Sequence, residues 1–360
     1  MNFRYIHSPQ DKKKYLDFQQ AIYQDNPYYR DSLSEITKLF LDHKISYLKH
    51  AKFFPFVIEK QGAIVLRAAF IIDYKQNNTL LVAFFEAGPG RQDAVDLMLQ
   101  KGKELAYAHR LTKMIIGLNG HLNYGVGFLA SHFDRVPAFG FPYNPPYYAG
   151  YFQGLREVNF STFWVEMEKF NLTRDEKLLK RIKKNGFTFR KADLRHLTKE
   201  LEIYTYLNNL CFHDHLWWAE RTVQEDYELF YPFRWFIKGE NLIIAEKDGR
   251  PAGLMLWYPD FNQLVPRGRG MGLTTLLKYQ LGIRPDTFKI AELAVHPRYR
   301  GTGLVLGFFA YLYGLVKDKY KYCEAGWVEA GNLQSRGLGS HFQELGCREY
   351  KRYQAYEVSL

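Results

Sequence analysis

Apolar residues recur along the first half of the chain with two different periods, and these periods predict both helices and strands. Over residues 11–48 they return every three or four positions, the spacing of helices with one buried face. Runs rich in Val, Ile and Phe then predict strands. The predicted strands cover residues 53–59, 63–73, 79–86, 113–117 and 159–167, with a helix over 92–109.

The second half repeats this order of elements. Its predicted helices lie within 196–230 and over 304–319 and 333–345, and its predicted strands cover 241–246, 252–258, 287–295, 322–328 and 350–358. Each half thus runs through helices, antiparallel strands, a long strand, a glycine turn, a helix and a strand, a repeat of architecture rather than of sequence. A charged segment, 169–191, contains a predicted helix over 173–184 and separates the halves.

These patterns predict an α+β fold with two domains. Each domain is expected to hold a mostly antiparallel mixed sheet flanked by helices. The predicted boundaries are 1–170 for the first domain, 171–188 for a linker and 189–360 for the second domain.

The composition indicates a folded protein with a preference for anions. The chain has 360 residues, of which 47% are hydrophobic and 17% aromatic, so it can fill two cores and is not disordered. Its net charge of +11 favours nucleic acid, anionic lipid or a phosphorylated cofactor, and an inert basic surface is the alternative. The loop at Arg267–Gly270 is read as a mobile basic segment, either solvated or facing an anionic substrate.

Cysteine and histidine positions argue against metal or disulfide chemistry. Cys211, Cys323 and Cys347 are far apart and form no CxxC pair. His213 and His215 have no third ligand nearby in the sequence, so we expect a structural or cleft-lining cluster and no metal. The chain shows no signal peptide and no apolar run long enough to span a membrane, which predicts a cytoplasmic protein without a membrane partner.

The most informative segment is a strand that runs through a glycine turn directly into an apolar helix. The turn reads Arg298-Tyr299-Arg300-Gly301-Thr302-Gly303 and precedes Leu304. The first amides of a helix have no partner within the helix, and the helix dipole favours negative charge there. Glycines let the backbone approach a ligand, and arginines bind phosphate oxygens. This order of residues predicts a site for a diphosphate.

The spacing Arg298-x-x-Gly301-x-Gly303 after a strand and before a helix resembles the acyl-CoA-binding motif of the GNAT superfamily. Glu329-x-x-Asn332, followed by a predicted helix and a terminal aromatic strand, is similar to the closing segment of that family. The whole chain also resembles bacterial proteins with two GNAT-like halves, of which the first is degenerate. Asn144-Pro145-Pro146-Tyr147-Tyr148 carries this second resemblance.

The resemblance implies an acyl-CoA-dependent N-acyltransferase, with acetyl-CoA as the expected donor. Its acceptor would be a primary amine, on a small molecule or a peptide amino terminus. Backbone groups of the long strand would hold the pantetheine arm and the acyl carbonyl, and amides of the turn would hold the diphosphate. The implied cofactor-binding residues are Leu293, Val295, Arg298, Tyr299, Arg300, Gly301, Thr302, Gly303, Leu304 and Asn332.

The attacking amine must first lose a proton, so the site needs a base. Glu292 on the long strand is the first candidate, because its apolar neighbours would raise the pKa of its carboxyl group. Glu329 is the second candidate, to stabilise the ammonium or orient Asn332, and Glu324 the third. Trp217, Trp218 and Tyr258 are the expected acceptor-binding residues. Many relatives place a tyrosine near position 342 to protonate the leaving thiolate, whereas this chain has Phe342.

The corresponding junction in the first half, Glu86-Ala87-Gly88-Pro89-Gly90-Arg91, departs from the motif. Pro89 has no amide proton, and Glu86 would repel a diphosphate, so we expect no CoA site there. Two other functions stay open. One is a tandem GNAT protein that takes aminoacyl-tRNA as donor, although the intact turn makes nucleic acid an unexpected partner. The other is a weakly catalytic protein that binds or senses acyl-CoA.

Overall fold

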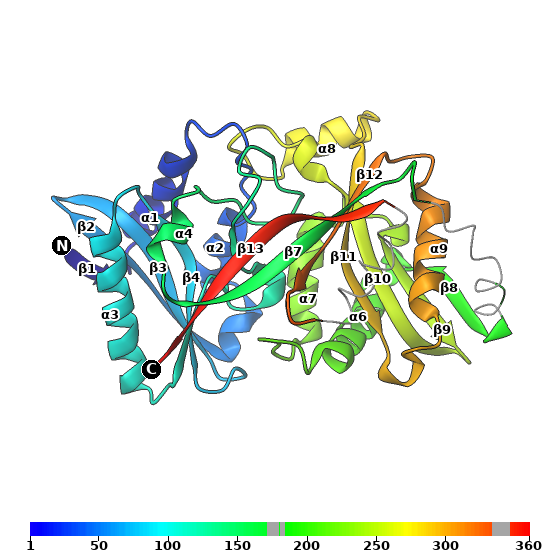
Figure 1. Ribbon diagram of the computed structural model, residues 1–360, viewed down its shortest axis with the longest axis horizontal. Coiled ribbons are helices and arrows are strands. Elements are labelled where there is room, and N and C mark those ends of the chain that lie inside the picture. Colours follow the sequence, from blue (N-terminus) through cyan, green and yellow to red (C-terminus); the bar gives the residue numbers. More distant parts are fainter. Residues whose placement is uncertain (171–179, 181–183, 333–345) are drawn as a thin grey trace. The chain divides into compact units, whose positions relative to one another are not determined.

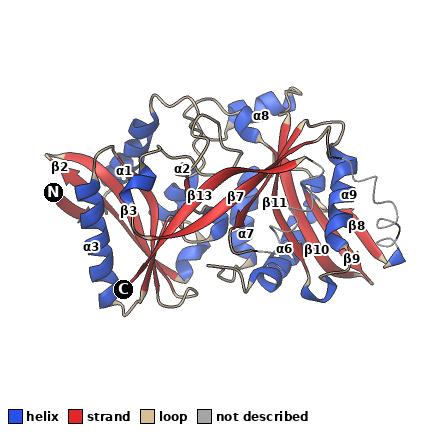
Figure 2. Cartoon of the chain, in the orientation of Figure 1, coloured by secondary structure: helices blue, strands red, loops and turns tan. Residues whose placement is uncertain are grey.

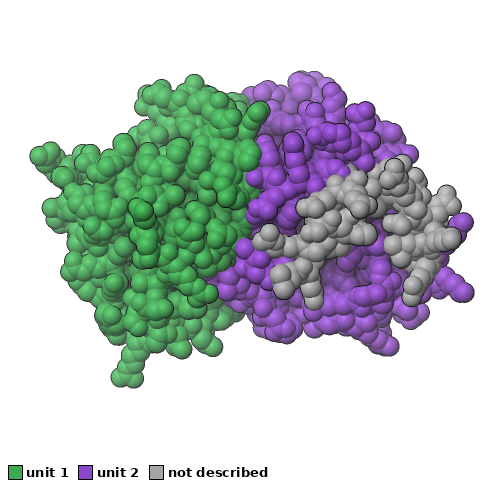
Figure 3. Space-filling view, in the orientation of Figure 1, with its two compact units in different colours: residues 1–160, 265–272, 351–360 green, residues 161–264, 273–350 purple. Residues whose placement is uncertain are grey.

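The computed structural model describes residues 1–170, 180, 184–332 and 346–360. Within it the chain forms two compact units (Figure 3). Unit 1 contains Met1–Phe160, Val265–Gly272 and Lys351–Leu360, and unit 2 contains Ser161–Leu264 and Leu273–Tyr350. The boundaries that the sequence predicts stay a proposal. The compact units divide the chain elsewhere, because two segments from the second half pack with the first.

The sheet of unit 1 is mostly antiparallel (Figures 1 and 2). Strands β1 (Asn2–Tyr5), β2 (Ala51–Lys60), β3 (Ala63–Asp73) and β4 (Thr79–Ala87) follow one another in the sheet, each antiparallel to the next. Strand β5 (Lys113–Ile116) is parallel to β4. The last residues of β13 (Cys347–Ser359) pair with β5 and with β6 (Phe128–Leu129).

Helices cover both faces of this sheet. Helix α3 (Gln92–Ala108) and the short α4 (Tyr148–Tyr151) pack on the face that contains Phe56 and Phe70. Helices α1 (Pro9–Tyr23) and α2 (Ser34–Leu41) pack on the opposite face, where Val57 lies. Neighbouring strand residues reach opposite faces because side chains alternate along a strand.

Unit 2 has the same plan. Strands β8 (Phe187–Lys191), β9 (Leu242–Lys247), β10 (Arg250–Pro259) and β11 (Thr287–Val295) are antiparallel neighbours, and β12 (Tyr322–Glu329) is parallel to β11. Helix α9 (Leu304–Val316) covers one face, and α6 (Leu197–Phe212) and α7 (Val223–Phe230) cover the other. Helix α8 (Leu273–Gln280) lies between β10 and β11 in the sequence. Strand β7 (Arg156–Glu166) contributes residues to both units.

Short 3₁₀ turns connect these elements. They cover Ser46–Lys49, Leu122–Tyr124, Leu194–His196, Tyr231–Phe233, Gly239–Asn241, Phe261–Gln263 and Pro297–Tyr299.

The predicted mixed α+β fold is confirmed, with local differences. The helical pattern over 11–48 divides into α1, α2 and a 3₁₀ turn, and the helix expected over 304–319 ends at Val316. The sequence did not predict α8. The helices expected over 173–184 and 333–345, together with Phe342, lie largely or wholly outside the described residues. Among the helices that are described, none is both long and apolar enough to cross a membrane.

The basic loop at Arg267–Gly270 is not a free segment, which corrects the sequence interpretation. Within unit 1 the guanidinium of Arg267 donates to the carbonyl oxygens of Gln24 and Asn26, at 3.1 and 3.2 Å. The amide of Gly268 donates to Tyr29, and Arg269 accepts from the amide of Asp31. Carbonyls at the end of helix α1 attract this arginine because the helix dipole leaves them negative.

Candidate functional site

The glycine turn of unit 2 leaves the first amides of helix α9 open. Gly301 has a φ of 76°, and Gly303, at the N-cap, has a φ of 85°, a left-handed conformation that favours glycine. No side chain in the described part of the chain caps the helix. Among the residues that the structure describes, the amides of Gly301, Gly303, Leu304 and Val305 have no acceptor, so four donors gather at the positive end of the helix dipole.

The rest of the turn is held rigidly by its own hydrogen bonds. The amides of Tyr299, Arg300 and Thr302 donate to carbonyl oxygens within the turn, at 2.8, 3.2 and 3.4 Å. The guanidinium of Arg300 donates to the carbonyl oxygen of Cys211, at 3.0 Å, near the end of helix α6. Of the six backbone positions that the family resemblance implies for the diphosphate, three amides are therefore already used, and the open ones are those of Gly301, Gly303 and Leu304.

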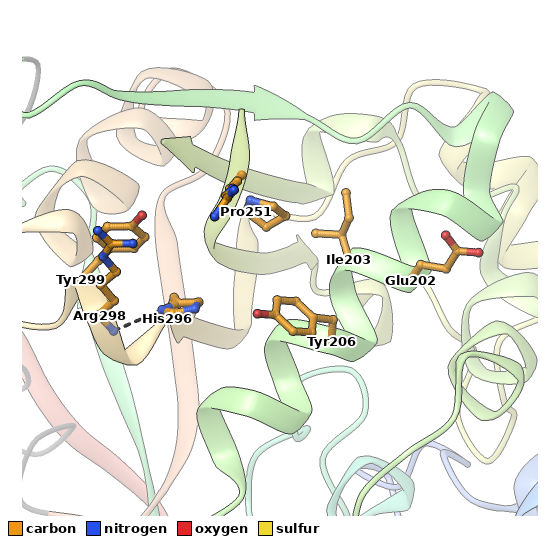
Figure 4. Close-up of a pocket in the computed structure, with 8 residues that line it drawn as sticks. Glu202, Ile203, Tyr206, Pro251, His296, Arg298 and Tyr299 are labelled. Carbon is orange, nitrogen blue, oxygen red and sulfur yellow. Dashed lines mark hydrogen bonds between the residues drawn. The ribbon is translucent and has the colours of Figure 1, made fainter. Parts of the chain in front are cut away.

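A pocket of about 460 Å³ flanks the turn (Figure 4). Its wall comes from α6, the start of β10 and the 3₁₀ turn, through Glu202, Ile203, Tyr206, Arg250, Pro251, His296, Arg298 and Tyr299. Nδ1 of His296 accepts the amide of Arg298, at 3.1 Å. Two arginines, Arg250 and Arg298, and one acidic residue, Glu202, line the pocket, so its lining carries a net positive charge beside the turn.

Strands β11 and β12 separate immediately before the turn. Their parallel pairing runs from Thr287 with Tyr322 to Ile290 with Ala325, although the strands continue to Val295 and Glu329. On its other edge β11 stays paired with β10 up to Val295, with a bulge near Leu256. Beyond Ile290, one edge of β11 has no paired strand among the residues that the structure describes.

The free edge of β11 presents the backbone groups of Leu293 and Val295, the two strand residues expected to bind the pantetheine arm and the acyl carbonyl. The amide of His296 donates to Ala252 on the β10 side, at 3.0 Å. Because backbone direction alternates along a strand, Ala294 also faces β10, and the amides of Leu293 and Val295 face the gap left by β12. These two residues at the end of β11 and the open amides at the start of α9 thus lie on one continuous segment, joined by the glycine turn.

Glu292 lies on the α6 face of β11 and is held by two donors from that helix. Tyr204 donates its hydroxyl to Oε1 at 2.7 Å, and Asn208 donates its amide to Oε2 at 3.1 Å. Although the side chain is only partly buried, its surroundings exclude enough water to raise the pKa of the carboxyl group to about 7. The hydroxyl of Tyr204 opposes this shift, and the charge of Asp226 adds to it.

Sequence reasoning missed Tyr204 and Asn208. Both are almost fully buried, and they stand four residues apart, so they lie on the same face of α6. The carbonyl oxygen of Asn208 is buried without a hydrogen-bond partner, which leaves an acceptor beside Glu292. Their spacing was visible in the sequence, but only the structure shows that this face meets β11.

The other acidic candidates have their own partners on and after β12. Oε1 of Glu329 accepts the amide of Gly331 at 2.7 Å, and its backbone oxygen accepts the amide of Asn332 at 3.0 Å, so Glu329 organises the turn after β12. Glu324 is buried and accepts the hydroxyl of Thr162 at 2.8 Å. Its position on β12 is directly opposite Lys289 of β11.

The aromatic candidates divide into two places. Tyr258 lies on β10, the strand that pairs with β11 beside Glu292. Burial, and then the negative charge of Glu292, raise the pKa of its phenol. Trp217 and Trp218 follow helix α6, and Trp218 packs on Phe212 with ring centroids 5.2 Å apart. Trp217 has a φ of 58°, a strained conformation for a bulky side chain. Within the described residues, no group of three His, Cys, Asp or Glu side chains is placed to hold a metal ion.

The corresponding junction of unit 1 is closed by tyrosines. Tyr148 accepts the amide of Ala87 at 2.9 Å, and Tyr147 donates to the carbonyl oxygen of the same residue at 3.0 Å. Tyr151 accepts the amide of Arg91 at 3.1 Å and donates to Gly88. Backbone groups of Ala87, Gly88 and Arg91, the N-cap of α3, therefore have side-chain partners here, whereas the amide of Gly303, the N-cap of α9, stays open among the described residues.

Glu86 nevertheless gives unit 1 a carboxyl group similar to that of Glu292. It accepts hydroxyl groups of Tyr148 and Tyr23, at 2.6 and 2.8 Å. Burial raises its pKa to about 7, and the charge of Arg67 opposes this shift.

The separated strands, the open amides and the tandem plan define a class of protein with two GNAT-like domains. Residues 210–341 match the model of the acetyltransferase (GNAT) family. This match lies in the second half of the chain and agrees with the resemblance to the GNAT superfamily that the sequence predicted.

Relatives and solved structures agree with this placement. The chain is 21% identical to Protein YghO of Escherichia coli (strain K12), over 97% of this chain and 93% of that protein. A tandem GNAT protein from the clavulanic acid biosynthesis pathway matches 99% of this chain and 98% of its own, with a TM-score of 0.52 and 13% identity. A GCN5-related glucosamine N-acetyltransferase region of a fungal multi-domain GH3 β-N-acetylglucosaminidase has a TM-score of 0.56 and 15% identity. That match includes 99% of this chain but only 38% of the longer fungal chain. At these identities the structures share the fold.

Proposed function

We propose that the protein is an acyl-CoA-dependent N-acyltransferase that transfers an acyl group, with acetyl the expected one, to a primary amine. The observation that carries the proposal is the set of open amides at Gly301–Val305, which lies beside the free edge of β11. A diphosphate fits this set because it accepts several hydrogen bonds and carries negative charge. Arg298 and the positive pocket next to it would add attraction for the same anion.

The free edge of β11 would bind the other end of the donor. A pantetheine arm that runs along this edge can accept from and donate to the backbone as a neighbouring strand would. The amide of Leu293 or Val295 would donate to the thioester oxygen, which gains negative charge during attack. No part of this arrangement requires a group from unit 1.

The proton chemistry would centre on Glu292. A carboxyl group with a pKa near 7 is largely ionised at pH 8 and can accept a proton from an ammonium group. The neutral amine then attacks the thioester carbon, the new C–N bond forms, and the C–S bond breaks. CoA leaves as a thiolate, which is a stable anion because a thiol has a pKa of about 8.5, and the second proton of the attacking nitrogen passes to the thiolate or to solvent. The side-chain oxygen of Asn208 would accept a hydrogen bond from an N–H group of the amine.

The proposal is tested by measuring free thiol release from acetyl-CoA and longer acyl-CoAs with a panel of primary amines and amino-terminal peptides. We expect Glu292→Gln to lower kcat by roughly a hundredfold or more while acyl-CoA binding stays unchanged, because a positioned base contributes about that much. For the native protein, kcat/KM should rise with pH through about 7 as Glu292 loses its proton.

A matched control is Glu246→Gln on β9, because Glu246 pairs with Arg190 and does not contact the residues around Glu292. Absence of thiol release with every donor and amine, or a Glu292→Gln variant as active as the native protein, would contradict the proposal.

A further inference from the structure

The connection between β10 and β11 is longer than the sheet requires. These strands are antiparallel neighbours, which a short hairpin turn can join. In unit 1 the corresponding strands β3 and β4 are joined by residues 74–78 alone. In the second half residues 260–286 make the connection and include helix α8. The sheet does not need this added helix, so the outer surface of α8 is available for another role.

Helix α8 presents an unusual stripe of exposed leucines. Leu273 and Leu277 lie one turn apart on the helix, and Leu281 continues the same spacing just after it. Their exposed fractions are 71%, 48% and 81%, and Ile283 adds a further 51%. The opposite side of the helix is anchored, because Thr275 and Tyr279 are buried and Tyr279 packs on Phe261 at 5.3 Å. Contiguous exposed apolar residues of this kind mark interaction surfaces.

Positive charge accompanies the stripe. Lys278 donates to the carbonyl oxygen of Leu264 at 3.1 Å, and Arg284 donates to that of Tyr279, so neither cation is neutralised by its partner. Between Leu273 and Asp286 the only acidic residue is Asp286 itself, and Gln263 donates to its carboxylate at 2.7 Å. The charge of Glu240 also reaches Tyr279, but Glu240 pairs with Lys191 at 2.9 Å and lies 3.6 Å from Lys319. The stripe is therefore apolar, and Lys278 and Arg284 give it a cationic border.

An exposed tryptophan is connected to α8 through buried aromatic residues. Trp235 is 64% exposed, and the guanidinium of Arg234 lies 5.1 Å from the centre of its ring. Its neighbour Phe236 packs on Phe261 at 5.4 Å, and Phe261 is the residue that contacts Tyr279 of α8. Tryptophan with an adjacent cation is the combination that is enriched where proteins meet the headgroup region of a bilayer.

We propose that α8 and the residues that follow it, 273–284, dock unit 2 on an anionic lipid surface, with Trp235 as an additional contact. The leucines would enter the boundary between headgroups and acyl chains, and Arg234, Lys278 and Arg284 would lie among the lipid phosphates. This is a helix that lies on a membrane rather than one that crosses it. The net charge made anionic lipid one of the possible partners, but no membrane partner was expected because the sequence contains no apolar run long enough to span a membrane.

Charge favours lipid over a second copy of the chain as the occupant. Each copy carries a net charge of +11 and the same cationic border, so two copies would bring like charges together around the stripe. An anionic bilayer offers the opposite charge and an apolar layer at the same time.

The test is co-sedimentation of the full chain with vesicles of phosphatidylglycerol and phosphatidylcholine, or of phosphatidylcholine alone. We expect binding to the anionic vesicles, which salt weakens, and at least tenfold weaker binding for Leu277→Glu/Leu281→Glu. The matched control is Tyr74→Glu/Tyr107→Glu, which adds the same charge at two exposed positions of unit 1, with exposed fractions of 60% and 62%. This control should bind like the native protein.

Three results would overturn the proposal. They are absence of binding to anionic vesicles, equal binding by the Leu277→Glu/Leu281→Glu variant, and a native dimer in light scattering that this variant dissolves into monomers. All four positions are exposed, so thermal unfolding should be unchanged in both double variants. Calorimetric titration of CoA reports on the proposed function separately, because the glycine turn is intact in every variant.

Discussion

At the residue scale, the chemistry depends on how Glu292 is surrounded. Burial alone would keep this carboxyl group protonated at neutral pH, whereas the hydroxyl of Tyr204 and the amide of Asn208 favour its ionised form. The charge of Asp226 on α7 opposes ionisation, and that of Arg221, paired with Asp226 at 2.6 Å, favours it. Tyr258 of β10 also borders the group. The balance places the pKa near 7, where a carboxylate can both take up and release a proton.

Tyr204→Phe should shift the pH dependence of acyl transfer to higher pH. The variant removes a donor to the carboxylate, so the pKa of Glu292 rises, and the inflection of kcat/KM moves upward from about 7. We expect a shift of about one to two pH units, because a hydrogen bond to a charged group contributes roughly 1.5–3 kcal/mol and one pKa unit corresponds to about 1.4 kcal/mol. Tyr74→Phe, at an exposed position of unit 1, is the control. An unchanged inflection would show that Tyr204 does not position the base.

At the element scale, the two strand-to-helix junctions show how one fold yields an open and a closed site. In unit 2 the turn from β11 to α9 carries two left-handed glycines and no cap. In unit 1 the shorter junction from β4 to α3 is filled by hydroxyl groups of Tyr147, Tyr148 and Tyr151. These tyrosines bind backbone groups of Ala87, Gly88 and Arg91, from the end of β4 to the N-cap of α3. This capping supports our proposal that unit 1 does not bind CoA.

The closed junction predicts a pH-dependent stability for unit 1. Glu86 has a pKa of about 7 in the folded chain, above the ordinary value of 4.5, so the folded state binds its proton more tightly. The free energy of unfolding should therefore fall as pH rises from about 4.5 through 7. Glu86→Gln should remove up to about 3 kcal/mol of this change, measured by urea unfolding at pH 5 and pH 8.

Glu292 has a similar pKa and contributes a change of the same sign in unit 2, so the comparison between native and variant chains isolates Glu86. Glu35→Gln, at an exposed position on α2, should follow the native protein. A Glu86→Gln variant with the native pH dependence would contradict the raised pKa.

At the scale of the whole molecule, local signals were predictable from the sequence and long-range contacts were not. Alternation and helical spacing located β2–β4 and β9–β12, because each pattern is complete within one element. The glycine turn was recognisable for the same reason. The capping of Ala87 by Tyr148 and the bond from Tyr204 to Glu292 join residues far apart in the sequence, and no local pattern reports such pairs.

Domain boundaries were the hardest part to predict. Residues 351–360 pack with unit 1, where Tyr353 and Tyr356 are buried, although they follow the second half in the sequence. Helix α8 escaped prediction because its apolar stripe faces outward and Gly270, Gly272 and Gly282 border it. For residues 351–360 and for α8, the sequence pattern is local, but the residues against which each segment packs lie far away in the sequence.

The central claim is that open backbone amides at the start of α9 bind the diphosphate of CoA, and calorimetric titration tests it most directly. The native protein should bind CoA at least tenfold more tightly than pantetheine, which lacks the diphosphate. Gly301→Leu should abolish that difference, while Gly249→Leu in the β9–β10 turn should retain it. Both glycines have a positive φ, of 76° and 71°, with no atom within 4 Å of an added Cβ, so the two variants carry the same strain. Equal affinity of the native protein for CoA and pantetheine, or unchanged CoA binding in Gly301→Leu, would contradict the account.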